Sequence, residues 1–199
     1  FVIDTPDKEN AMLFARVDLP ANLSDADMPA LITADWIIGG SDGLSNRIVN
    51  RLRQKEGLSY GSGSNITLPS FGNRAKWSVG AIVAPQNLAQ AEKSLKDELA
   101  RAYRDGITEA ELAEAKRGII GSRAVNRAQD GMVASNWVNN LETGRTWQFS
   151  KETEAAIEAL TVEDVNKALR RFCDVSKLTF ALAGDLAKAK AAGKDFTQP

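Results

Sequence analysis

Residues 39–60 read GGSDGLSNRIVNRLRQKEGLSY, and this stretch decides how the rest of the chain is arranged. It begins with two glycines, continues as a short helix, stops at Gly57 and turns into a strand. The helix is indicated by apolar residues at helical spacing, namely Leu44, Ile48, Val49 and Leu52. Gly57 stands where a glycine commonly ends a helix. We expect a solvated helix face made of Arg47, Arg51 and Lys55.

Arg53 and Tyr60 are the two side chains of this stretch that we single out. Arg53 lies at the border between the apolar and the solvated face of the helix, near its end. From Leu58 the pattern changes to strand alternation, which puts Leu58, Tyr60, Ser62, Ser64 and Ile66 on one side. We therefore expect Arg53 and Tyr60 to face one space across the turn. Taken singly, Arg53 would be interpreted as an ordinary surface arginine and Tyr60 as an ordinary strand aromatic. Their spacing within a long ordered motif reverses that preference.

The order and spacing of these residues resemble a known signature. Gly39-Gly40, Ser45–Ile48 and Leu52–Tyr60 look like the motif of the non-catalytic half of pitrilysin/insulinase-family zinc peptidases, the inverse zincins. The resemblance extends more loosely from about Asp7 to about Asp185. It implies that Arg53 and Tyr60, seven residues apart as in that family, bind peptide substrate near a zinc ion on a homologous partner domain.

Residue counts limit the chemistry that this chain can perform. It has no histidine and a single cysteine, Cys173, so it cannot supply the His-x-x-Glu-His zinc motif or a Ser-His or Cys-His pair. Carboxylate chemistry remains open, but no carboxylate pair stands out. We expect no catalytic residue and no metal ligand on this chain, and no peptidase activity from it alone. By resemblance, zinc is the partner's cofactor.

Charge and hydropathy exclude two classes of partner. The 199 residues carry a formal net charge of −1, which gives no basic surface for nucleic acid or for an anionic membrane. We see no apolar run long enough to cross a membrane. The first residues are neither a start methionine nor a signal peptide, so we interpret the chain as a fragment. Its compartment stays open, bacterial periplasm and cytoplasm included.

Periodicity along the chain predicts an α+β fold, in which helices pack on one face of an antiparallel-type sheet. Thr108 and Glu111 form a predicted capping box at one helix start. We expect one domain over residues 1–186 and a tail or linker over residues 187–199. The expected strands cover residues 12–19, 58–68, 74–83 and 177–183, and the expected helices cover residues 24–38, 44–56, 85–105, 108–127, 130–144 and 161–172.

Two functions follow from these observations. The first is a substrate-binding, non-catalytic domain of a zinc metalloendopeptidase, which positions peptide for a zinc-bearing partner. The second is a structural or assembly subunit that resembles such peptidases without a role in proteolysis, as core subunits of respiratory complexes do. We also expect the glycines of the hairpin over residues 58–83 to admit an extended peptide at or near a strand edge.

Overall fold

The computed structural model describes residues 1–40 and 45–193, and within them a single sheet of five strands forms the base of the fold. The strand order is β1-β5-β2-β4-β3. Only the pairing of β1 with β5 is parallel, and the other three pairings are antiparallel. The strands are β1 (Val2–Asp4), β2 (Ala11–Leu19), β3 (Ser59–Thr67), β4 (Ala75–Val83) and β5 (Thr179–Gly184).

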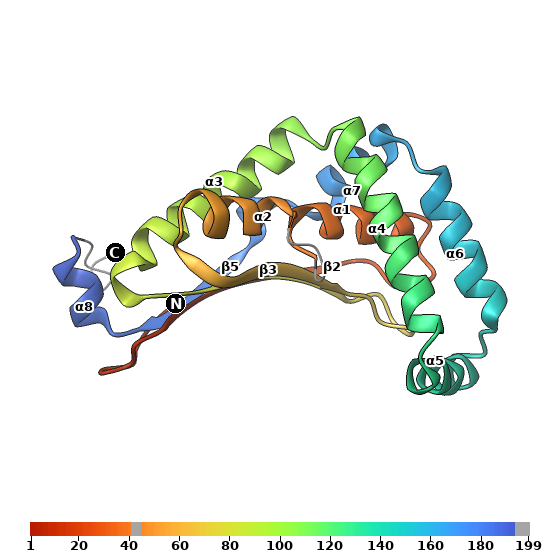
Figure 1. The fold of residues 1–199 in the computed structure, drawn as a ribbon, viewed down its shortest axis with the longest axis horizontal. Coiled ribbons are helices and arrows are strands. Elements are labelled where there is room, and N and C mark those ends of the chain that lie inside the picture. Colours follow the sequence, from red (N-terminus) through yellow and green to blue (C-terminus); the bar gives the residue numbers. More distant parts are fainter. Residues whose placement is uncertain (41–44, 194–199) are drawn as a thin grey trace.

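The helices gather on one face of this sheet, which confirms the predicted fold class (Figure 1). Helices α1, α3, α4 and α7 lie over the sheet, while α5 and α6 stand at one end and α8 at the other. The helical elements are α1 (Met28–Ile38), α2 (Arg47–Val49), η1 (Asn50–Lys55), η2 (Pro85–Asn87), α3 (Leu88–Asp105), α4 (Glu109–Arg127), α5 (Asp130–Thr143), α6 (Trp147–Ala159), α7 (Val162–Phe172), η3 (Val175–Lys177) and α8 (Leu186–Ala191).

Strand alternation determines which sheet face meets the helices. On β2, Leu13 and Ala15 are fully buried, whereas their neighbours Met12 and Phe14 are exposed on the opposite face. On β4 the predicted inward face is buried throughout, namely Ala75, Trp77, Val79, Ala81 and Val83. Burying this apolar area drives the helix layer onto the sheet. No helix of the described residues covers the other sheet face (Figure 1).

Local sequence signals place several boundaries correctly. The capping box of Thr108 and Glu111 is present at the start of α4, and Thr161 forms another with Asp164 at the start of α7. The start of helix α1 was predicted too early. The helix begins at Met28, because the residues before it form turns through the side chains of Asn22 and Asp25.

The first residues of the predicted tail belong to helix α8, and its Ala189 is buried.

Strand β1 and helix α6 escaped the sequence analysis, as did the short turn η3. Strand β1 was not predicted, since its three residues are exposed and show no alternation. It is held by pairing with β5, at the other end of the chain. Helix α6 was also missed, although Thr146 caps it by accepting a hydrogen bond from the Gln148 amide at 3.2 Å. No helix in the described part of the chain is both long enough and apolar enough to span a membrane.

Candidate functional site

The segment before Gly57 is less regular than the predicted helix. The Asn46 side chain caps α2 by accepting a hydrogen bond from the Val49 amide at 2.9 Å. The chain then widens into the π-helical turn η1, a feature that is common at functional sites. Leu52 is fully buried and anchors this turn, and Gly57 ends it with φ of 63°. The predicted apolar residue Leu44 lies outside the described residues.

Tyr60 is placed by a β-bulge. Ser59 pairs with Val83 and Gly61 pairs with Ile82, so Tyr60 is the extra residue between them. Ser59 turns inward and donates hydrogen bonds to the carbonyl oxygens of Gly61 and Ile82, at 2.9 and 2.7 Å. Tyr60 is 87% exposed. The predicted alternation, with Tyr60 on the side of Ser62, Ser64 and Ile66, is therefore wrong, because the bulge shifts the register.

The structure brings Arg53 and Tyr60 together across the turn. The guanidinium carbon of Arg53 lies 4.7 Å from the centre of the Tyr60 ring, which is cation–π geometry. Both residues are exposed, and Arg53 has no ion-pair partner among the described residues. Neither is needed to fill the core. The guanidinium and the phenol hydroxyl are hydrogen-bond donors that a peptide carbonyl can accept.

Strand β3, which carries Tyr60, lies at the edge of the sheet, but half of that edge is already bonded. The Ser64 amide donates to the Gly39 carbonyl at 2.8 Å, and the Ile66 amide donates to Asp35 at 3.1 Å. A side chain on Gly63 would meet the Gly39 oxygen at 2.7 Å. The absence of a side chain at Gly63 thus makes room for the backbone of Gly39, where a bound peptide was predicted. Since outward amides alternate along an edge, the next outward amide is that of Ser62, for which residues 1–40 and 45–193 show no backbone partner beyond the strand.

Asp35, on the buried helix α1, holds this edge in place and was missed in the sequence. Its carboxylate accepts hydrogen bonds from the Ser64 hydroxyl at 2.6 Å, the Ile66 amide at 3.1 Å and the Trp77 indole at 3.1 Å. Burial raises the pKa of Asp35, and these three hydrogen bonds oppose the rise. A lone acid in an otherwise apolar helix was the signal that could have revealed it.

The predicted solvated face of the helix needs correction. The Arg47 side chain is only 10% exposed and forms an ion pair with Glu111 of α4, with hydrogen bonds of 2.6 and 2.8 Å. Arg51 is half-buried and pairs with Glu56. The spacing of the arginines predicted a solvent-exposed helix face, because the sequence does not show that α4 packs beside residues 47–55. Lys55 is exposed, as predicted.

Other titratable groups give no catalytic arrangement. Among residues 1–40 and 45–193, no three His, Cys, Asp or Glu side chains are grouped so that they could hold a metal ion. Cys173 is buried at the end of α7, and burial raises the pKa of its thiol, so it is an inert core residue. The Arg53–Tyr60 pair, beside the open end of the β3 edge, is therefore the candidate site.

Comparison with known proteins supports the resemblance inferred from the motif. The family model of the peptidase M16 inactive domain matches residues 1–119, a range that includes both Arg53 and Tyr60. The chain belongs to the peptidase M16 inactive-domain family. No sequence among the curated proteins matches this M16 domain.

Solved structures share the fold of this M16 domain. A peptidase M16 inactive domain from Pseudomonas fluorescens has a TM-score of 0.81 at 24% identity, over 92% of this chain and 42% of the other. A protease from Helicobacter pylori has a TM-score of 0.80 at 18% identity, over 92% and 43%. A chain of complex III from Candida albicans has a TM-score of 0.76 at 17% identity, over 96% and 48%. This chain thus spans about two fifths of the length of the first two of these proteins.

Proposed function

We propose that this chain is the substrate-binding, non-catalytic domain of a zinc metalloendopeptidase. In this proposal it positions a peptide for a homologous, zinc-bearing partner domain or subunit. The observation that carries the proposal is the Arg53–Tyr60 pair, in which two side chains are stacked on each other at the exposed edge of the sheet. Membership of the M16 inactive-domain family supports it.

The two side chains have distinct tasks in this proposal. The Tyr60 hydroxyl donates a hydrogen bond to a peptide carbonyl, and the Arg53 guanidinium supplies a fixed positive charge beside it. The bulge directs Tyr60 away from the core, and stacking restricts how both side chains move before a peptide binds. The partner's zinc would polarise the scissile carbonyl and activate water. This chain would orient the peptide and stabilise charge on the carbonyl oxygen.

The test is turnover in a complex reconstituted with the zinc-bearing partner. Tyr60→Phe keeps the ring and removes the hydroxyl, and Arg53→Ala removes the charge. If the lost donor faces developing oxyanion charge, kcat should fall roughly a hundredfold, or about 3 kcal/mol. A donor that only positions neutral substrate should cost about 1 kcal/mol. Zinc content and the free energy of unfolding should not change.

Matched controls come from the same chain. Tyr103→Phe also removes one phenol hydroxyl, which makes only a weak contact of 3.5 Å with the Arg170 carbonyl. Lys55→Ala removes one exposed positive charge from the same turn as Arg53. Arg51 is unsuitable as a control because it is paired with Glu56. If the variants at Arg53 and Tyr60 lose no more activity than these controls, the pair does not bind substrate.

A structural or assembly subunit is the second candidate function. The similarity to a chain of complex III from Candida albicans, at a TM-score of 0.76, favours it, because that protein is part of a large assembly. The sequence of the neighbouring domain or subunit separates the two. A His-x-x-Glu-His motif there would support proteolysis, and a partner without zinc ligands would support assembly. Hydrolysis by this chain alone, with zinc retained after chelation, would contradict both.

A further inference from the structure

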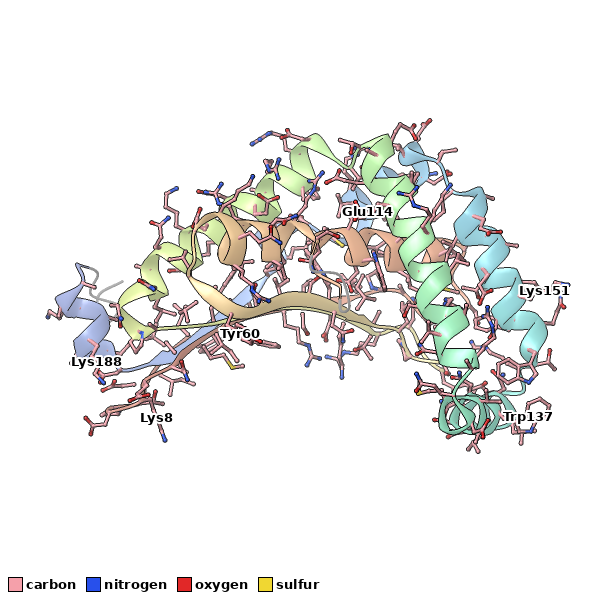
Figure 2. All side chains as sticks on the ribbon, in the orientation of Figure 1. Lys8, Tyr60, Glu114, Trp137, Lys151 and Lys188 are labelled. Atoms are coloured by element: carbon pink, nitrogen blue, oxygen red, sulfur yellow. The ribbon has the colours of Figure 1, made fainter. Side chains whose placement is uncertain are left out.

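A cleft lies at the end of the molecule formed by α5 and α6, away from Tyr60. Its volume is about 670 Å³, and it lies between helices α4, α5 and α6 and the turn that joins β3 to β4. Figure 2 shows Trp137 of α5 at one end of the molecule and Tyr60 well away from it, beneath the sheet. Clefts of this size commonly bind ligands. The Arg53–Tyr60 pair does not contribute to it, so it is a separate feature.

Helix α5 turns its polar side toward this cleft. An amphipathic helix normally packs its apolar face against the protein. Here Val138 and Leu141 are 61% and 68% exposed, and no residue of α5 is buried. Apart from Met132, its cleft-lining side chains are polar, namely Asn136, Asn139, Asn140, Glu142 and Thr143. The amides offer both donors and acceptors, which are the groups that a peptide backbone requires.

Arg145 brings a positive charge without a matching carboxylate. Its guanidinium donates hydrogen bonds to the hydroxyls of Ser24 and Ser70, at 3.1 and 3.3 Å, and lies 4.5 Å from the centre of the Phe149 ring. In the described part of the chain, no carboxylate forms an ion pair with it. These contacts with uncharged groups fix the position of the Arg145 guanidinium and leave its charge available to an anion.

Two further arginines line the cleft and share one carboxylate. Arg127 pairs with Glu154, and Arg123 lies 3.9 Å from the same side chain. Burial lowers the pKa of Arg123, Glu154 opposes this effect, and nearby Arg127 adds to it. A bound anion would act as Glu154 does and favour the charged guanidinium. Counting Glu142 as well, the cleft has three positive and two negative side chains.

We propose that this cleft binds an acidic segment of a polypeptide. A carboxylate of the segment is held by Arg145, its backbone by the asparagines of α5, and its apolar parts by Phe71 and Trp147. With Glu142 and Glu154 present, the lining carries only one net positive charge, which suits a segment with few carboxylates better than a phosphate chain with a charge at every residue. The site does not depend on the function proposed for Arg53 and Tyr60.

Fluorescence anisotropy with the 199-residue chain tests this proposal. The probe is a short labelled peptide that carries two glutamates, and its matched control has glutamine at each of those positions. Hydrogen bonds to charged groups are strong enough that the glutamate peptide should bind about tenfold more tightly, with an affinity that falls as salt is added. Equal binding of the two peptides, or no binding of either, would overturn the proposal. So would tighter binding of a single-stranded oligonucleotide.

Variants connect the binding to the cleft. Arg145→Ala should weaken binding of the glutamate peptide about tenfold. Asn136→Asp puts a negative charge on the α5 wall at a half-buried position and should weaken it similarly, without removing any contact of Arg145. Arg117→Ala, on the exposed side of α4, removes the same charge as Arg145→Ala and should have no effect.

A further control separates this site from general surface charge near Arg53 and Tyr60. Lys55→Ala should leave binding of the glutamate peptide unchanged, because Lys55 is exposed and does not line the cleft. If Arg117→Ala or Lys55→Ala weakens binding as much as Arg145→Ala, the peptide is attracted by general surface charge, and the proposed cleft site is wrong.

Discussion

Glu111→Gln tests the ion pair that holds helix α2, through Arg47, against helix α4. Arg47 donates hydrogen bonds of 2.6 and 2.8 Å to the two carboxylate oxygens of Glu111, and a third of 2.8 Å to the Gly106 carbonyl. Its Nη1 is buried and forms no hydrogen bond in the described structure. Glutamine can still complete the capping box with Thr108 through its amide oxygen, so this substitution spares the cap and removes the charge together with one acceptor of the Arg47 hydrogen bonds.

The pKa of Glu111 gives the size of the expected effect. Burial opposes its ionisation, but the Arg47 and Thr108 hydrogen bonds outweigh burial and lower the pKa from 4.5 to about 2. At 1.36 kcal/mol per pH unit, this difference corresponds to roughly 3 kcal/mol. Solvent screens the pair because the Glu111 side chain is 29% exposed. We therefore expect Glu111→Gln to lower the free energy of unfolding by about 2 kcal/mol.

Urea unfolding followed by circular dichroism measures this loss as a function of pH. The folded pKa of Glu111 lies below the unfolded value, so the folded state binds fewer protons in this range. Its contribution is complete above pH 4.5 and is lost as the pH falls toward 2. The difference between the natural protein and Glu111→Gln should therefore be largest near pH 7 and shrink below pH 4.5.

A matched control is Asp97→Asn, which breaks the exposed pair with Lys93 and should change stability little. The reasoning is refuted if Glu111→Gln is as stable as the natural protein at pH 7. It is also refuted if the difference persists unchanged at low pH, because the loss would then not come from the carboxylate charge.

Three further predictions concern buried contacts. Gly63→Ala should lower the free energy of unfolding by about 2 kcal/mol, because the added Cβ would meet the Gly39 oxygen at 2.7 Å. Gly61→Ala is the control, because there is space for a Cβ at Gly61 and the free energy of unfolding should change little. Asp35→Asn should cost about 2 kcal/mol in the same urea experiment, since an amide nitrogen cannot accept the hydrogen bonds of the carboxylate. Cys173 should react with a thiol reagent only as fast as the protein unfolds, and rapid labelling of the native chain would contradict its burial.

The sequence by itself determined the elements whose signals are local. The capping box of Thr108 and Glu111 marks a helix start because its hydrogen bonds span only three residues. The alternation on β4 predicts one buried face because side-chain direction repeats every two residues. The order and spacing of the motif around Arg53 and Tyr60 were enough to predict the family.

Only the tertiary structure decided which side chains of the motif are free to act. The bulge at Tyr60 depends on how β3 pairs with β4, and the burial of Arg47 depends on Glu111, 64 residues further along the chain. The closing of half the β3 edge depends on the approach of Gly39 to Ser64. Local patterns cannot encode these contacts, because each is fixed by packing between segments that are distant in the sequence.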